Sequence, residues 1–71
     1  MNTKNQITET KAIEMANCIL KPGFTVSLMS LDDAEDFIWG YLYDNGLQYQ
    51  KPIEYINDNG FTCVALVYQE G

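Results

Sequence analysis

The sequence predicts a small α+β domain in the order α-β-α-β-β, with two helices packed on a three-stranded, mostly antiparallel sheet. Three observations lead to this fold. Ser30 to Gly46 has helical periodicity between a start and a stop signal. Phe24 to Met29 alternates apolar and polar residues, as a half-buried strand does. Phe61 to Tyr68 is a continuous apolar and β-branched run, typical of a central strand. With 71 residues the chain is one domain, 1–71, of which 1–6 is expected to be frayed.

The first helix is predicted to end at Leu20. Thr8 is a candidate N-cap, and Thr3 with Gln6 is an alternative, earlier capping box. Pro22 with Gly23 stops the helix. Its apolar face comprises Ala12, Met15, Ala16 and Ile19.

The second helix follows the first strand almost without a loop. Ser30 with Asp33 forms a capping-box pattern, and Gly46 supplies the left-handed residue that commonly ends a helix. At 100° per residue an apolar stripe forms on one side. Its members are Leu31, Ala34, Phe37, Ile38, Tyr41 and Leu42. Trp39 and Tyr43 are expected one turn apart on the opposite face, beside acidic residues.

The remaining two strands form a hairpin. Leu47 to Ile56 alternates, but Pro52 cannot donate to a sheet ladder and therefore indicates an edge strand or a split strand. Asn57 to Gly60 predicts a type I′ turn. We expect the strand order 1-3-2, which places the most apolar strand, Phe61 to Tyr68, in the centre. A three-stranded meander with the helices on one side is the alternative.

The apolarity of Phe61 to Tyr68 on both faces bears on assembly. If both helices cover one face of the sheet, the other face needs a cover, such as a second copy of the chain. If the helices lie on opposite faces, nothing is left over. A homodimer through the sheet, acting as a self-associating scaffold module, is therefore one functional hypothesis.

The net charge of −6 comes from ten acidic residues against four lysines, with neither arginine nor histidine. This balance argues against direct binding of nucleic acid or of anionic membranes, and it favours a basic protein partner. The simpler interpretation is that the charge keeps a small protein soluble. The N-terminus is polar and no apolar run is long enough to span a bilayer, so a cytoplasmic location is expected.

No catalytic or metal-binding constellation is evident, so the chain is not expected to be an enzyme or to hold a cofactor. Without histidine there is no imidazole base and no nucleophile–imidazole pair. Asp32 and Asp36 lie four residues apart, but in an exposed first turn they favour capping over acid catalysis. Cys18 and Cys63 are expected to be small buried apolar residues, because they lack activating neighbours.

The leading hypothesis is a small acidic regulator or inhibitor of a basic protein, such as a nucleic-acid-handling or defence enzyme. The predicted partner-binding residues are Asp32, Glu35, Asp36, Trp39 and Tyr43. An exposed tryptophan among acids is typical of binding hot spots. The alternative is that Trp39 is covered by the N-terminal segment or by the Leu47–Ile56 strand.

In size, acidity and lack of a catalytic set, the sequence resembles phage-encoded inhibitors of host nucleases and defence systems. The resemblance is to a broad class and rests on composition, so it carries over no residue. It implies action on a protein in the host cytoplasm.

Overall fold

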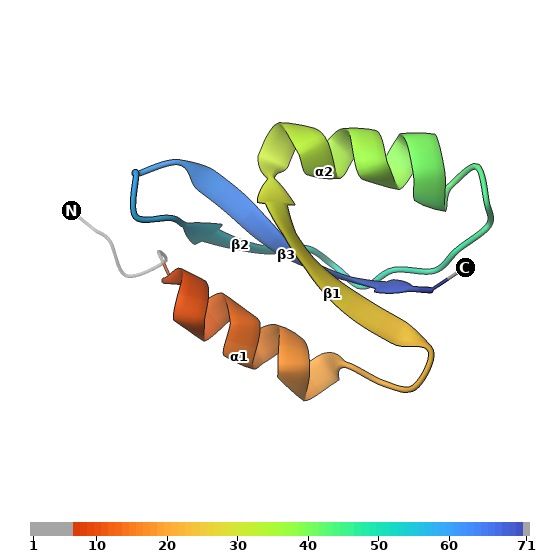
Figure 1. The fold of residues 1–71 in the computed structure, drawn as a ribbon, viewed down its shortest axis with the longest axis horizontal. Helices are drawn as coiled ribbons and strands as arrows, with labels where there is room; N and C mark the ends of the chain where they lie inside the picture. Colours follow the sequence, from red (N-terminus) through yellow and green to blue (C-terminus); the bar gives the residue numbers. More distant parts are fainter. Residues whose placement is uncertain (1–6, 71) are drawn as a thin grey trace.

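The computed structural model describes residues 7–70 and contains two helical segments and three strands (Figure 1). The elements are α1 (Glu9–Ile19), β1 (Phe24–Ser30), α2 (Leu31–Phe37), the π-helical turn η1 (Ile38–Leu42), β2 (Ile53–Ile56) and β3 (Thr62–Gln69). This confirms the predicted order α-β-α-β-β. The expected fraying of 1–6 and the alternative cap at Thr3 lie outside the described residues.

The sheet has the order β1-β3-β2, with β3 antiparallel to both neighbours. The predicted order 1-3-2 is confirmed. The meander alternative is wrong, because it would place β2 in the centre. The β1–β3 pairing runs without interruption from Phe24 opposite Gln69 to Ser30 opposite Cys63.

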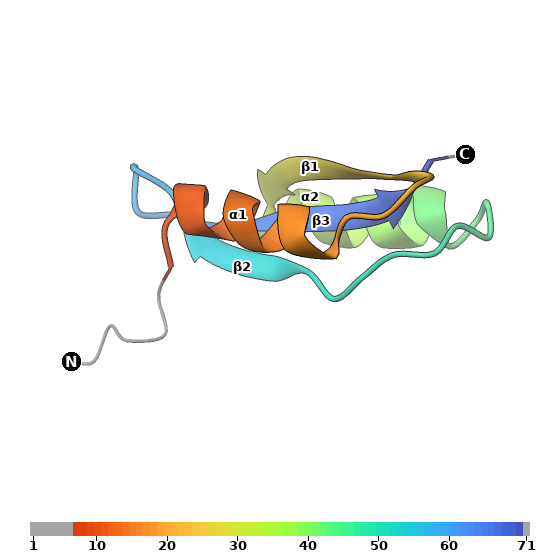
Figure 2. The same ribbon diagram turned by 90° about the horizontal axis from the view of Figure 1, so that it is seen from below.

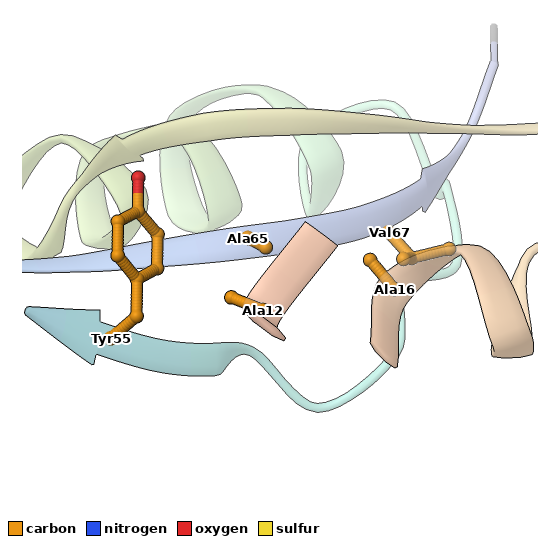
Figure 3. Packing of buried hydrophobic residues seen from close by; sticks show 5 residues of the cluster. All are labelled: Ala12, Ala16, Tyr55, Ala65 and Val67. Atoms are coloured by element: carbon orange, nitrogen blue, oxygen red, sulfur yellow. The ribbon is translucent and has the colours of Figure 1, made fainter. Parts of the chain in front are cut away.

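The two helices lie on opposite faces of the sheet. α1 packs over β2 and β3, whereas α2 packs over β3 and β1 (Figure 2). On the α1 face, Ala12 and Ala16 meet a cluster formed by Tyr55, Ala65 and Val67 (Figure 3). Alternate residues of β3, including the buried Val64 and Leu66, point to the α2 face. Both apolar faces of β3 are thus covered within one chain, so the two-sided apolarity of β3 no longer argues for a dimer.

α1 begins and ends where the sequence indicates. Thr8 is the N-cap, and its Oγ1 accepts a hydrogen bond from the Lys11 N–H at 3.1 Å. Gly23 has φ of 86°, which reverses the chain into β1. Of the predicted apolar face only Ala12 and Ala16 are fully buried, since small side chains let the helix approach the sheet closely. Met15 and Ile19 remain 40% and 42% exposed beside this contact.

Pro52 acts as predicted: β2 is an edge strand, and the Leu47–Ile56 stretch is split, with only Ile53–Ile56 regular and Tyr49 in an isolated bridge to Tyr68. The connection from β2 to β3 differs from the prediction. The predicted type I′ turn is wrong, because Gly60 has positive φ (85°) but no other residue of the turn does. Asn57 organises the loop instead: its Oδ1 accepts from the N–H groups of Asn59 and Phe61, both at 2.9 Å. The loop is therefore held by the Asn57 side chain, and not by the two consecutive positive-φ residues that a type I′ turn requires.

Tyr55 makes the fold sensitive to alkaline pH. Burial raises the pKa of its hydroxyl above the ordinary value of 10.0, and Cys63 and Glu9 add to the increase. The folded state therefore holds this proton more tightly than the unfolded state. Tyr55 stabilises the fold fully below about pH 10, and this contribution is lost as the pH rises through the folded-state pKa.

We expect the free energy of unfolding of the wild type, measured with urea at several alkaline pH values, to fall more steeply above about pH 10 than that of Tyr55→Phe. Tyr43→Phe is the matched control, because Tyr43 is 70% exposed. That variant should follow the wild-type curve. Parallel curves for all three proteins would show that Tyr55 ionises as an exposed tyrosine does.

Candidate functional site

The junction between β1 and α2 positions the acidic residues. Ser30 ends β1 and caps α2, and its Oγ accepts a hydrogen bond from the Asp33 N–H at 3.1 Å. The helix therefore starts directly at the sheet. Asp32 and Asp33 occupy its first turn, where unpaired N–H groups favour negative charge. Both side chains are exposed.

The predicted continuous helix from Ser30 to Gly46 needs correction. The α-helix ends at Phe37 and continues as the π turn η1, in which the Tyr43 N–H donates to the Ile38 carbonyl at 2.8 Å. A π turn aligns residues five apart rather than four. Leu42, five residues after Phe37, is fully buried. Tyr41, which was expected in the apolar stripe, is 41% exposed and stacks on Phe37 with ring centroids 5.1 Å apart.

The rest of the predicted stripe is buried to different degrees. Ala34 is buried, Phe37 and Ile38 are half-buried, and Leu31 is 40% exposed. Phe37 also meets Tyr68 of β3 edge-to-face, with centroids 4.9 Å apart. Gly46 has φ of 66° and ends the helical region, as predicted.

Trp39 and Tyr43 form an aromatic pair on the surface of this segment. Their side chains are 64% and 70% exposed, and their ring centroids lie 5.3 Å apart with planes tilted by 57°. The alternative that the Leu47–Ile56 region covers Trp39 is wrong, since most of the indole faces solvent. The two rings shield each other in part and form one exposed aromatic patch.

Acidic side chains lie next to this aromatic patch, on the side toward the start of α2. Glu35 and Asp36 precede Trp39 by four and three residues, which makes them its neighbours on the helix surface, and Asp32 lies one turn further back. All three are exposed. We call this surface the acidic–aromatic face: Asp32, Glu35, Asp36, Trp39 and Tyr43. Its role in binding stays a prediction.

Charge is distributed unevenly along the chain. Residues 30–46 hold five of the ten acidic residues and none of the four lysines. The lysines that the structure describes lie elsewhere: Lys11 in α1, Lys21 after it, and Lys51 before β2. No residue within the segment 30–46 therefore offsets its five negative charges.

The cysteines differ from expectation. Cys18 is exposed and Cys63 is only half-buried, so the prediction of two buried cysteines is wrong. Cys18 lies on the solvent side of α1 because the core side is occupied by Ala12 and Ala16. Both thiols are free. Asn57 Nδ2 lies 3.5 Å from Cys63 Sγ, within hydrogen-bonding range for sulfur.

Two surface features were not predicted from the sequence. Phe61 was assigned to the central strand, but it lies in the loop before β3 and is 68% exposed. The adjoining Asn-Gly pair is the signal that the loop extends this far. An apolar groove of about 460 Å³ also lies between α1 and β2. Its lining comprises Ile7, Met15, Ile19, Lys51, Pro52, Ile53 and Glu54. These residues are far apart in the sequence, so no local pattern indicates the groove.

Within residues 7–70, no cluster of three or more potential metal ligands occurs. No helix in the same range is long and apolar enough to cross a membrane. Comparison with protein-family models, curated proteins and solved structures found no match to this chain.

Because Trp39 is exposed, replacing it should affect the stability of the fold much less than replacing a core residue. Trp39→Ala should change the free energy of unfolding by less than about 0.5 kcal/mol, because little buried area is lost. Leu42→Ala, three residues away, should cost about 2–5 kcal/mol through a cavity. Thermal melts of the two variants check this. Equal destabilisation would mean that Trp39 belongs to the core.

Proposed function

We propose that this chain is a small acidic regulator or inhibitor that binds a basic surface of a partner protein through the acidic–aromatic face. The single observation that carries the proposal is the exposed Trp39–Tyr43 pair beside acidic residues in a segment without lysine. A nucleic-acid-handling or defence enzyme is the class of partner that we favour, because such enzymes present basic surfaces. The protein itself would have no catalytic activity and would act in the cytoplasm, which suits its two free thiols.

The chemistry of the face matches the side chains of a basic partner. The ring faces of tryptophan and tyrosine attract the guanidinium of arginine or the ammonium of lysine. Carboxylates one turn away would pair with the same cations or with their neighbours. The long-range negative field would also speed the encounter with a positively charged surface. A partner is thus steered by Asp32, Glu35 and Asp36 and anchored by Trp39.

The experiment that tests the proposal is capture of proteins from the native host on the immobilised chain, read by mass spectrometry. A captured basic protein is then measured against wild type and against Trp39→Ala. We expect Trp39→Ala to weaken binding by about 2 kcal/mol or more, as for a hot-spot aromatic. Phe61→Ala is the matched control, because Phe61 is 68% exposed on another part of the surface. If both variants bind as the wild type does, Trp39 is not the anchor.

The role of charge is tested by neutralising three acids at a time. Asp32→Asn, Glu35→Gln and Asp36→Asn together should slow association with the captured partner by about tenfold at low salt, and the difference should shrink as salt rises. The control removes the same charge elsewhere: Glu14→Gln, Glu54→Gln and Glu70→Gln, all exposed in the wild type. Equal slowing by both triple variants would reduce the effect to net charge and would contradict a localised face.

A further inference from the structure

The two edges of the sheet are protected to very different degrees. The outer edge of β2 is short and is interrupted by Pro52. Its backbone is also occupied, since the Ile56 N–H donates to the Ile7 carbonyl at 3.1 Å. Glu54 adds a charge to this strand. β2 therefore has several of the features by which proteins prevent strands from pairing with other chains.

β1 has none of these features. It is seven residues long (FTVSLMS), contains neither proline nor a charged residue, and pairs with β3 in an unbroken register. Among the described residues, only β3 pairs with it in the sheet. Figure 2 shows β1 as the outermost strand of the sheet on the side opposite β2. Such an edge presents a row of backbone donors and acceptors ready to accept another strand.

One face of β1 is also incompletely covered. α1 packs over β2 and β3 and leaves the corresponding side of β1 open. Val26 and Leu28 lie on this side, because they pair with Val67 and Ala65 of the α1-facing core. Leu28 is 40% exposed and Val26 is half-buried. The open edge thus adjoins Leu28, an exposed apolar side chain, while Val26 beside it packs against the α1-facing core.

We propose that β1 pairs antiparallel with β1 of a second copy, joining two sheets into one of six strands. The sequence of β1 is suited to pairing with itself. A two-fold axis through Ser27 places Val26 opposite Leu28 of the partner subunit. The same axis places Leu28 opposite Val26 of the partner subunit, so this pair occurs twice. Phe24 lies opposite Ser30 of the partner subunit, and no like charges face each other. Each exposed Leu28 then packs beside Val26 of the partner subunit and loses part of its contact with water.

The rest of the fold accommodates this pairing. α2 lies over both β3 and β1, so a strand spacing of about 4.8 Å places the two α2 axes about 10 Å apart, a normal helix packing distance. The acidic N-terminal turns start after Ser30 and lie at opposite ends of the strand pair. They are separated by about 20 Å, more than twice the screening length of about 8 Å at physiological salt. Asp32 and Asp33 of one copy are therefore largely screened from those of the other.

The test is sedimentation of the purified chain over a concentration series, with two variants. Wild type should form dimers whose fraction rises with concentration. Leu28→Lys should raise the dimer dissociation constant by about tenfold or more, because the two-fold axis removes two cross-strand pairs at once. Met15→Lys is the control: Met15 has the same 40% exposure but lines the groove beside β2. It should dimerise as the wild type does.

Hydrogen exchange of the wild type provides a second measurement that needs no variant. Alternate amides of β1 face away from β3, so they should gain protection as the protein concentration rises. A monomer at high micromolar concentration would overturn the proposal and leave the edge for an extended segment of another protein. A dimer without protection of β1 would equally overturn it, because another surface would then join the copies. If Leu28→Lys fails to fold, this measurement decides alone.

Discussion

The structure depends on burying both faces of β3. Val64, Ala65, Leu66 and Val67 follow one another in this strand, and none is more than 1% exposed. Since successive side chains point to opposite faces, no single layer can cover them. The chain must place one helix on each side and one strand along each edge. The opposite positions of α1 and α2 and the central place of β3 both follow from this requirement.

The same requirement leaves specific surfaces open. α1 covers β2 and β3 and α2 covers β3 and β1, so each outer strand is covered by a helix on one face only. The outer edge of β2 is protected by Pro52 and by the hydrogen bond from the Ile56 N–H to the Ile7 carbonyl. On β1 no described segment compensates. A domain of this size has one helix for each face of the sheet. These two helices cover both faces of the central strand but only one face of each outer strand.

Sequence reasoning was accurate where a local pattern determined the outcome. The caps at Thr8 and Ser30, the central position of the Phe61–Tyr68 run and the strand order all follow from periodicity, turn residues and burial. It was wrong where longer-range packing decides. The pattern placed both Tyr41 and Leu42 in the apolar stripe, whereas the π turn buries Leu42 and leaves Tyr41 41% exposed. No local signal reveals such a turn, in which the helix gains one residue. The sequence also left open which face of the sheet each helix covers, because that depends on packing between distant segments. Cys18 shows the same limit, since two alanines took the core positions of its helix.

The acidic–aromatic face is not explained by the needs of the fold. α2 and η1 contribute Ala34 and Leu42 to the core, and these residues would be buried whatever stood at Trp39 and Tyr43. Large aromatic side chains held in water gain little stability for a domain, and they increase the risk of unspecific association. Their position in a segment with five acids and no lysine adds a charge pattern that capping alone does not require, since Ser30 already satisfies an N–H of the first turn. An exposed aromatic pair and a local excess of negative charge therefore coincide on one surface. The basic partner that we propose would use both.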